Sequence, residues 1–99
     1  MRVFITGGHG FIGKFVVQKI DNGKNKILLL TNNTKQVSSS RNIFFANGNL
    51  ADINKWQKTV KNFNPHTAIH LAWEGIPDYR VENSLKNLNY GLNLYKFLA

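Results

Sequence analysis

The sequence predicts an α/β fold of the Rossmann type: a doubly wound parallel sheet of about four strands, with helices on both faces. Short β-branched and aromatic runs alternate with segments of helical periodicity, and a glycine-rich turn follows the first run. No internal repeat or obvious linker interrupts this alternation, so residues 1–99 are expected to form one domain. Right-handed crossovers between the strands then favour the strand order 3-2-1-4.

Composition excludes several classes of protein. The hydrophobic share of 42% is enough for a core and excludes a disordered basic tail, and the absence of cysteine excludes disulfides and Cys-based zinc sites. The net charge of +8 admits nucleic acid as a partner, but the basic residues never form a block, so nucleic-acid binding is only a remote alternative. No apolar run approaches the roughly 18 residues that cross a bilayer. We expect no membrane association and a cytoplasmic location.

The first half of the chain reads strand, helix, strand, strand. A first buried strand at residues 2–6 stops at two glycines, and a second strand is expected at residues 26–30. Residues 31–42 read as a loop, and a third strand is expected at residues 43–46. Gly23 is placed at the left-handed C′ position that ends the first helix. The apolar positions of that helix are Phe11, Ile12, Phe15, Val16 and Ile20.

The second half reads helix, strand, helix. Asp52 is expected to cap a helix that Pro65 ends, and a fourth buried strand follows at residues 67–72. The apolar stripe of the capped helix is Ile53, Trp56, Val60 and Phe63. Trp56 is expected in the core. The stripe of the last helix is Leu85, Leu88, Leu92 and Tyr95.

The glycine-rich turn is the most informative segment. Residues 3–13 read V-F-I-T-G-G-H-G-F-I-G, in which Gly8, Gly10 and Gly13 satisfy G-x-G-x-x-G and Gly7, Gly10 and Gly13 satisfy G-x-x-G-x-x-G. An early glycine allows the tight turn, the middle one lets the backbone approach a pyrophosphate, and the last lets the helix pack close to the sheet. The helix N-terminus offers free N–H groups to phosphates. We interpret the segment as a dinucleotide-binding loop; the alternative is an ordinary turn that binds nothing.

The acidic residue expected about 20 positions later is missing. No carboxylate occurs between residues 22 and 51, so nothing there would hold a ribose diol and repel a 2′-phosphate. Lys35 and Arg41 supply positive charge, whereas Thr31 and Asn32 offer weaker hydrogen bonds to ribose hydroxyls. Both NAD and NADP remain open as the cofactor, and the charges favour NADP slightly.

Four segments in order resemble the motifs of the extended short-chain dehydrogenases/reductases, the NAD(P)-dependent epimerases, dehydratases and reductases of nucleotide sugars. Residues 6–13 (T-G-G-H-G-F-I-G) resemble T-G-x-x-G-x-[IL]-G, and residues 47–52 (N-G-N-L-A-D) resemble G-D-[LI]-x-D. Residues 64–72 (N-P-H-T-A-I-H-L-A) resemble P-D-x-V-I-H-L-A-A, and residues 87–94 (N-L-N-Y-G-L-N-L) resemble N-V-x-G-T-x-N-L. The resemblance covers almost the whole chain.

The resemblance implies a set of cofactor contacts. Glycine-loop residues would line the pyrophosphate, the pair ending the second strand would meet the adenosine ribose, and the pair after the third strand would flank adenine. Three residues of the fourth-strand segment would lead toward nicotinamide, and an asparagine of the last helix would brace the loop before it. These residues are Gly7, Gly10, Phe11, Ile12, Gly13, Thr31, Asn32, Asn49, Leu50, Leu71, Ala72, Trp73 and Asn87.

Two departures from the family pattern concern the cofactor. Asn49 replaces an aspartate that accepts a hydrogen bond from the adenine amino group, so its side-chain carbonyl would have to serve instead. Trp73 replaces a small residue and would crowd the nicotinamide end. Contact of Trp73 with a ligand and simple loop packing remain equally open.

The largest departure is the absence of the family's Tyr-x-x-x-Lys pair, in which tyrosine moves the proton. Four residues after Tyr79, Tyr90 and Tyr95 stand asparagine, leucine and alanine. The resemblance therefore implies the N-terminal, cofactor-binding part of a longer parent, inactive alone, that meets its nucleotide-sugar substrate only with the missing part. The alternative is a non-catalytic binding or interaction module that kept the fold.

The remaining candidates are weaker. His70 lies on a buried-strand pattern and is expected to be a hydrogen-bonded core residue rather than a base, while His9 either touches a phosphate or faces solvent. The three histidines fall on separate elements, so we expect no metal site. With no fifth strand in residues 1–99, the edge of the fourth strand would be unpaired, which predicts a homodimer through this strand or poor solubility.

Overall fold

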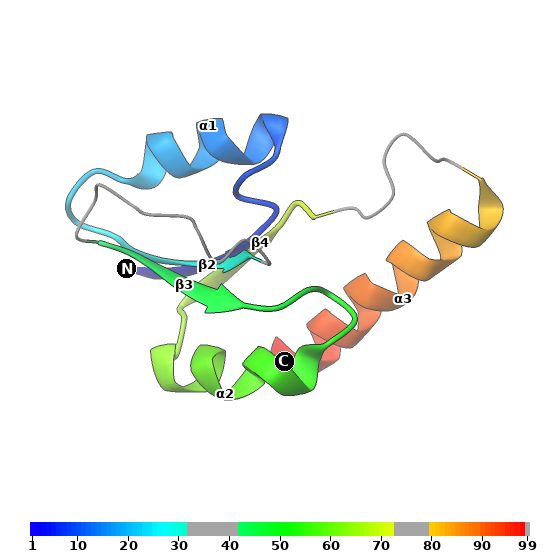
Figure 1. Cartoon of the computed structure of the whole chain (residues 1–99). Helices are drawn as coiled ribbons and strands as arrows, with labels where there is room; N and C mark the ends of the chain where they lie inside the picture. The colour runs from blue at the N-terminus through cyan, green and yellow to red at the C-terminus, as the bar shows by residue number, and fades with distance from the viewer. Residues whose placement is uncertain (32–41, 73–79, 99) are drawn as a thin grey trace.

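The computed structural model describes residues 1–31, 42–72 and 80–98 and has the predicted Rossmann-type architecture (Figure 1). Four strands form one parallel sheet in the order β3-β2-β1-β4, which confirms the predicted order. The elements in chain order are β1 (Arg2–Thr6), α1 (Phe11–Ile20), β2 (Lys26–Thr31), β3 (Ile43–Asn47), α2 (Ile53–Phe63), β4 (Thr67–His70) and α3 (Val81–Leu98).

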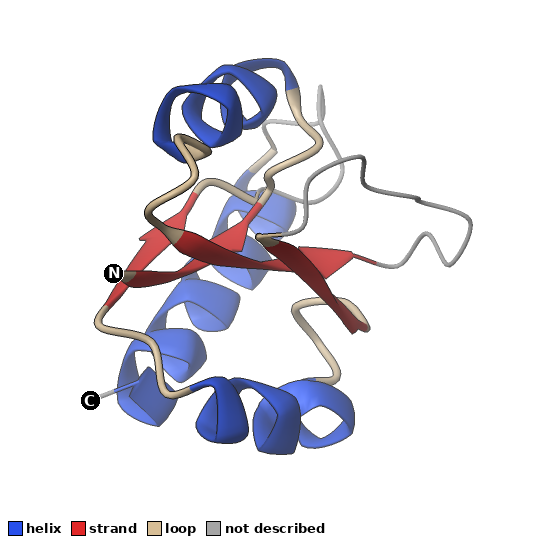
Figure 2. Ribbon diagram, turned by 90° about the vertical axis from the view of Figure 1, so that its left-hand side faces the viewer, coloured by secondary structure: helices blue, strands red, loops and turns tan. Residues whose placement is uncertain are grey.

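The helices cover both faces of the sheet. Figure 2 shows α1 on one side, with α2 and α3 together on the other. Because β1 and β2 are the central strands, their side chains are buried on both faces, which explains their uninterrupted apolar runs. The predicted loop after β2 falls largely on residues 32–41, outside the described residues.

The larger core lies between the sheet and the pair α2 and α3. Trp56 is 1% exposed, and its ring lies 5.7 Å from that of Phe4 and 5.9 Å, edge-on, from that of Phe97. Its indole N–H donates to the backbone carbonyl of Asn49 at 2.8 Å, so this large side chain is buried with its polar atom satisfied. The predicted core position of Trp56 is confirmed. A second cluster beneath α1 contains Val3, Ile5, Ile27 and Leu29.

Two predicted helix signals work differently from expectation. Asp52 occupies the N-cap of α2 but makes no capping hydrogen bond; its backbone is not extended (φ −110°, ψ 48°), and its carboxylate lies 3.7 Å from Lys55 Nζ. The C-cap of α1 is Asp21, so Gly23, with φ +81°, lies two residues later and not at C′. The Asn25 side chain instead donates to the Ile20 carbonyl near the end of α1.

The prediction of a buried fourth strand over residues 67–72 is wrong in two respects. β4 ends at His70 because β1 ends at its partner Thr6 and turns away at Gly7. Leu71 therefore lies beyond the strand and is 38% exposed. Of the four residues of β4 only Ile69 is even partly buried, because β4 is the edge strand of the described sheet.

The predicted apolar stripe of α3 faces away from the core. Leu88 is 54% and Tyr95 72% exposed, and the other two members, Leu85 and Leu92, are also exposed. The core face of α3 consists instead of Asn87, Tyr90, Leu94, Phe97 and Leu98. Both sets follow helical spacing, so the sequence pattern could not distinguish them. Among the described helices, none combines the length and apolar character needed to span a membrane.

Candidate functional site

The parallel sheet brings the predicted site segments to one edge. Thr6, Leu30 and Ala46 are register partners in neighbouring strands, so β1, β2 and β3 all end at the same level, and Thr6 pairs with His70 at the end of β4. The glycine loop and the turns that follow β2, β3 and β4 all leave the sheet here. Ligands of open α/β sheets bind in the crevice outside the carboxyl ends of the strands.

Gly7 forms the turn out of β1 and cannot be replaced without strain. Its φ is +75°, and a Cβ built on it would lie 2.6 Å from the backbone nitrogen of Ala72. The glycine loop is therefore in direct backbone contact with the segment after β4. Gly8 is less restricted, since its Cβ would lie 2.7 Å from the tip of the Leu29 side chain, which can move, and not from backbone.

Gly13 lets the first turn of α1 pack against the loop. A Cβ at Gly13 would lie only 1.9 Å from the Gly7 carbonyl oxygen. The close approach predicted for this glycine is thus made to the loop's own backbone. The same Gly7 carbonyl accepts the backbone N–H of Gly10 at 3.1 Å, so one oxygen holds the loop closed.

The N-terminus of α1 is open toward the crevice. Gly10 is the N-cap residue, is exposed, and has no side chain to cap the helix; the first turn contains no acidic residue. The first N–H groups of an α-helix have no intrahelical acceptor, which leaves those of residues 11–13 directed out of the helix end with its partial positive charge. Ile12 is 65% exposed, whereas the side chain of Phe11 lies outside the described part. A Cβ built on Gly10 would have no described side chain within 4 Å, only the Gly7 carbonyl oxygen at 3.3 Å.

His9 extends from the same bend. Its side chain is exposed, and its ring stacks on that of Phe45 with centroids 6.2 Å apart and planes 13° apart. The ring therefore lies over the end of β3, beside the open N-terminus of α1.

Thr31 ends β2 at the level expected for an adenosine ribose, but its side chain is only 6% exposed. Its backbone carbonyl accepts the N–H of Gly48 at 2.9 Å, which links the end of β2 to the turn after β3. Asn32, together with the predicted positive charges Lys35 and Arg41, lies outside the described residues.

The predicted adenine segment follows β3. Asn49 is partly exposed, and its side-chain carbonyl accepts the backbone N–H of Ala51 at 3.0 Å. A carbonyl oxygen has two lone pairs, so this bond leaves one acceptor position. Leu50 is 5% exposed and belongs to the larger core, so its side chain points inward and any contact with adenine would fall to its backbone.

The predicted nicotinamide segment follows β4. The backbone N–H of Leu71 donates to the Thr6 carbonyl at 3.0 Å, and that of Ala72 to the Thr6 hydroxyl at 3.3 Å. Trp73 lies outside the described residues. Asn87 is 5% exposed and its amide donates to the Asn83 carbonyl within α3 at 3.0 Å, so its predicted bracing of the preceding loop stays a prediction.

Thr6 and His70 form a polar pair that the sequence analysis missed. The Thr6 hydroxyl lies 2.5 Å from His70 Nδ1, and burial lowers the pKa of His70 below its ordinary value of 6.5. The expectation of a hydrogen-bonded core histidine is right in its hydrogen bond and wrong in its burial, because β4 is the edge strand of the described sheet and His70 is exposed there. The threonine before the first glycine was the only available signal, and it does not specify a histidine 64 residues away.

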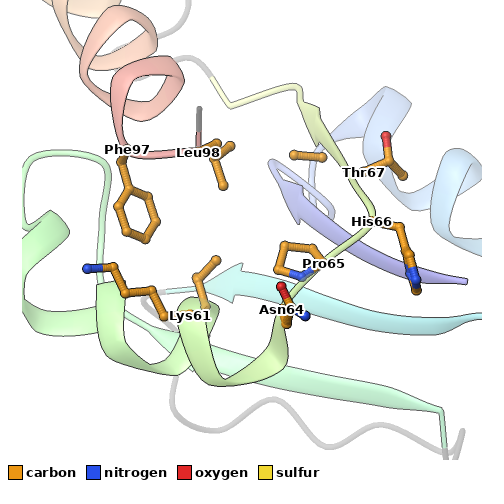
Figure 3. A pocket seen from close by; sticks show the side chains of 9 residues that line it. Lys61, Asn64, Pro65, His66, Thr67, Phe97 and Leu98 are labelled. Carbon is orange, nitrogen blue, oxygen red and sulfur yellow. The ribbon is translucent and has the colours of Figure 1, made fainter.

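A separate hollow of about 330 Å³ opens at the opposite end of the sheet, between α2, the start of β4 and the end of α3 (Figure 3). Lys61, Pro65, Thr67 and Phe97 are among its lining residues. It lies by the amino end of β4, away from the glycine loop, and so does not belong to the candidate site. In the described ranges, no three His, Asp or Glu side chains gather as a metal site would require.

Comparison with known proteins agrees with this geometry. The sequence model of the NAD dependent epimerase/dehydratase family matches residues 3–98, nearly the entire chain. The chain belongs to this family. A curated member of similar sequence is dTDP-6-deoxy-L-talose 4-dehydrogenase (NAD(+)) of Aggregatibacter actinomycetemcomitans, 26% identical over 102 residues, which cover 100% of this chain and 36% of that enzyme.

Solved structures show the same epimerase/dehydratase fold. UDP-glucose 4-epimerase of Thermus thermophilus, in complex with NAD, has a TM-score of 0.75 and 26% identity over 98% of this chain and 33% of its own. The Bordetella bronchiseptica enzyme WbmG, in complex with NAD, has a TM-score of 0.79 and 22% identity over 98% of this chain and 33% of its own. The chain thus spans about a third of the length of these relatives.

Gly13 and Gly91 provide a matched test of the packing at the start of α1, because both are helical glycines. We expect Gly13→Ala to lower the free energy of unfolding by about 1–3 kcal/mol or more, since the new Cβ overlaps the Gly7 carbonyl. Gly91→Ala, whose nearest neighbour would be the His70 ring at an ordinary 3.6 Å, should raise it by about 0.5–1 kcal/mol. Urea unfolding followed by circular dichroism measures both, and equal effects would contradict the assigned packing.

Proposed function

We propose that this chain binds the pyrophosphate of NAD or NADP at the glycine loop. The observation that carries the proposal is the exposed, uncapped N-terminus of α1 behind Gly10, at the edge of the sheet where all four strands end. Backbone N–H groups and the helix dipole suit a diphosphate there, and no acidic side chain in the first turn opposes it. The net charge of +8 acts in the same direction.

The neighbouring turns supply the rest of the cofactor site in this proposal. The end of β2 and the turn after β3, held together by the bond between Thr31 and Gly48, lie on the adenosine side. The second lone pair of the Asn49 side-chain carbonyl is placed to accept from the adenine amino group. Leu71 and Ala72, held by Thr6, lie on the nicotinamide side.

The chemistry of the relatives points to sugar nucleotides as the substrate class. One relative is a dTDP-sugar dehydrogenase and another a UDP-glucose 4-epimerase, and a bound dinucleotide supplies the hydride acceptor for such reactions. No tyrosine of this chain is followed by lysine four residues later. We infer that turnover requires a proton-transfer segment that residues 1–99 do not contain. A non-catalytic binding module is the alternative, and an in-frame downstream Tyr-x-x-x-Lys would decide against it.

Gly10→Val tests the placement of the pyrophosphate. The φ of Gly10 is −73°, which any residue adopts, and a Cβ there would meet only the Gly7 carbonyl oxygen at 3.3 Å, so the variant is expected to fold after a small local shift, while its side chain would occupy the space over the helix end. Titration of NADH, followed by its fluorescence, should show binding to the unchanged chain and none to the variant. Lys19→Val, which adds the same side chain at the other end of α1, should bind normally. Unchanged affinity in Gly10→Val would place the pyrophosphate elsewhere.

Selectivity between the two dinucleotides tests the missing carboxylate. The relatives described above contain or use NAD, which does not support the slight preference for NADP expected from sequence. With no carboxylate between residues 22 and 51 to repel a 2′-phosphate, we expect Kd values for NADH and NADPH within about tenfold of each other. Asn32→Asp should shift the preference toward NADH. A strong preference in the unchanged chain would point to recognition outside this segment.

We also propose that two copies of this chain pair through their β4 edges. β4 is an edge of the described sheet, Thr67, Ala68 and His70 are exposed, and the strand carries no lysine or acidic residue to discourage pairing.

A charge on the β4 edge should prevent this pairing. We expect light scattering to show a dimer at high protein concentration for the unchanged chain and a monomer for Thr67→Lys, because a lysine on an edge strand opposes strand addition. Asn54→Lys adds the same charge on the exposed side of α2 and should leave the dimer intact. A strictly monomeric unchanged chain would overturn the proposal.

A further inference from the structure

The Thr6 hydroxyl stands between two partners. It is 1% exposed, accepts the backbone N–H of Ala72 at 3.3 Å and lies 2.5 Å from His70 Nδ1. A hydroxyl has one hydrogen to donate and two lone pairs. Since Ala72 uses a lone pair, the hydrogen is free to point at His70 Nδ1. This assignment makes His70 an acceptor at Nδ1 and places the proton of the neutral ring on Nε2.

The Ala72 backbone held in this way is part of the wall of the glycine loop. Its nitrogen would lie 2.6 Å from a Cβ on Gly7, so these two backbones are in close contact. Gly7 in turn accepts the Gly10 N–H through its carbonyl and abuts Gly13 through the same atom. A continuous chain of contacts therefore runs from the His70 ring, through the Thr6 hydroxyl and Ala72, to the loop that precedes the open end of α1.

We propose that His70 is a positioning residue for the dinucleotide site, holding Ala72 against the glycine loop through the Thr6 hydroxyl only while its ring is neutral. The inference rests on the proposed function, because the ligand is the same dinucleotide. Protonation would convert Nδ1 from an acceptor into a donor aimed at Thr6. Because Thr6 is 1% exposed, its hydroxyl would then have to turn its hydrogen away from the ring toward the protein interior, at the cost of an unsatisfied polar group.

The groups around the ring indicate that His70, and not a neighbouring charged group, is the residue that titrates. Thr6 contacts it from β1, and Gly91 faces it from α3, with a Cβ built there 3.6 Å from Nε2. Neither group is titratable, and within the described residues no charged partner is recorded against the ring. Although His70 is exposed at the sheet edge, the partial desolvation of its ring lowers its pKa below 6.5, so the neutral form prevails at neutral pH. Affinity for the cofactor should therefore be constant above pH 6.5 and should fall as the pH drops below this value through the pKa of His70.

The experiment measures the Kd for NAD by isothermal titration calorimetry between pH 5 and 8. For the unchanged chain, Kd should rise as the pH falls through the His70 transition. His70→Asn places an amide oxygen near the position of Nδ1 that accepts but does not titrate, so its Kd should stay flat over this range. Thr6→Val should raise Kd by about tenfold at pH 7.5, because Ala72 loses its acceptor. Thr6→Ser, which keeps the hydroxyl, should stay close to the unchanged chain.

The imidazole ¹⁵N shifts, recorded without cofactor, report the tautomer and the titration of His70 independently of binding. An unprotonated Nδ1 at neutral pH is expected. The positioning role is wrong if the Kd for NAD does not change over the pH range in which His70 titrates. It is also wrong if the Kd rises at low pH by the same factor in His70→Asn. In both cases NAD still binds, so the proposed cofactor site is unaffected. If the unchanged chain binds neither NAD nor NADP at any pH, the proposed function itself fails, and this inference fails with it.

Discussion

The carbonyl oxygen of Gly7 is the atom on which the arrangement of the site depends. It accepts the Gly10 N–H and lies where a side chain on Gly13 would have to be. Gly7 itself has a positive φ and lies so close to Ala72 that a Cβ on it would be 2.6 Å from the Ala72 backbone nitrogen. Three backbone segments therefore meet with no side chain between them. That close contact sets the direction of α1 relative to β1 and leaves the end of the helix open at the edge of the sheet.

The parallel sheet makes this local contact useful. Because every strand runs the same way, the end of each one delivers a turn to the same edge as the glycine loop. The two cores, one beneath α1 and one beneath α2 and α3, hold the sheet from both sides. Trp56 joins the larger core, beneath α2 and α3, to the site, since its indole N–H donates to the carbonyl of Asn49 in the turn after β3. Packing and site geometry are thus connected through single hydrogen bonds.

The accuracy of the sequence analysis differed between elements for identifiable reasons. The positions of the first three strands, the strand order and the glycine turn were predicted because apolar runs and glycine spacing are local signals. The buried face of α3 was not, because Leu85, Leu88, Leu92 and Tyr95 have the same spacing as Asn87, Tyr90, Leu94 and Phe97, shifted by two residues. The second set includes a buried asparagine, so an apolar count favoured the face that is exposed.

In the candidate site, too, local features were predicted from the sequence and contacts between distant segments were not. The resemblance to the family named the glycines and the turns, and the structure brings the described ones to one edge of the sheet. It did not show that Leu50 is a core residue or that the Asn49 side chain is already bonded to Ala51, because both facts depend on how the turn after β3 meets α2. The partnership of Thr6 and His70 joins residues 64 positions apart, and no local pattern predicts it.

By itself, the sequence determined the class of fold, the loop that turns out of the first strand and the family, because glycine spacing and hydrophobic periodicity act over a few residues. Tertiary structure alone decided which face of α3 is buried, that β4 ends where β1 turns away, and which residues the Thr6 hydroxyl contacts. These features arise where two segments distant in the chain compete for the same space. Their outcome is set by steric fit and hydrogen-bond partners that exist only once the sheet has formed.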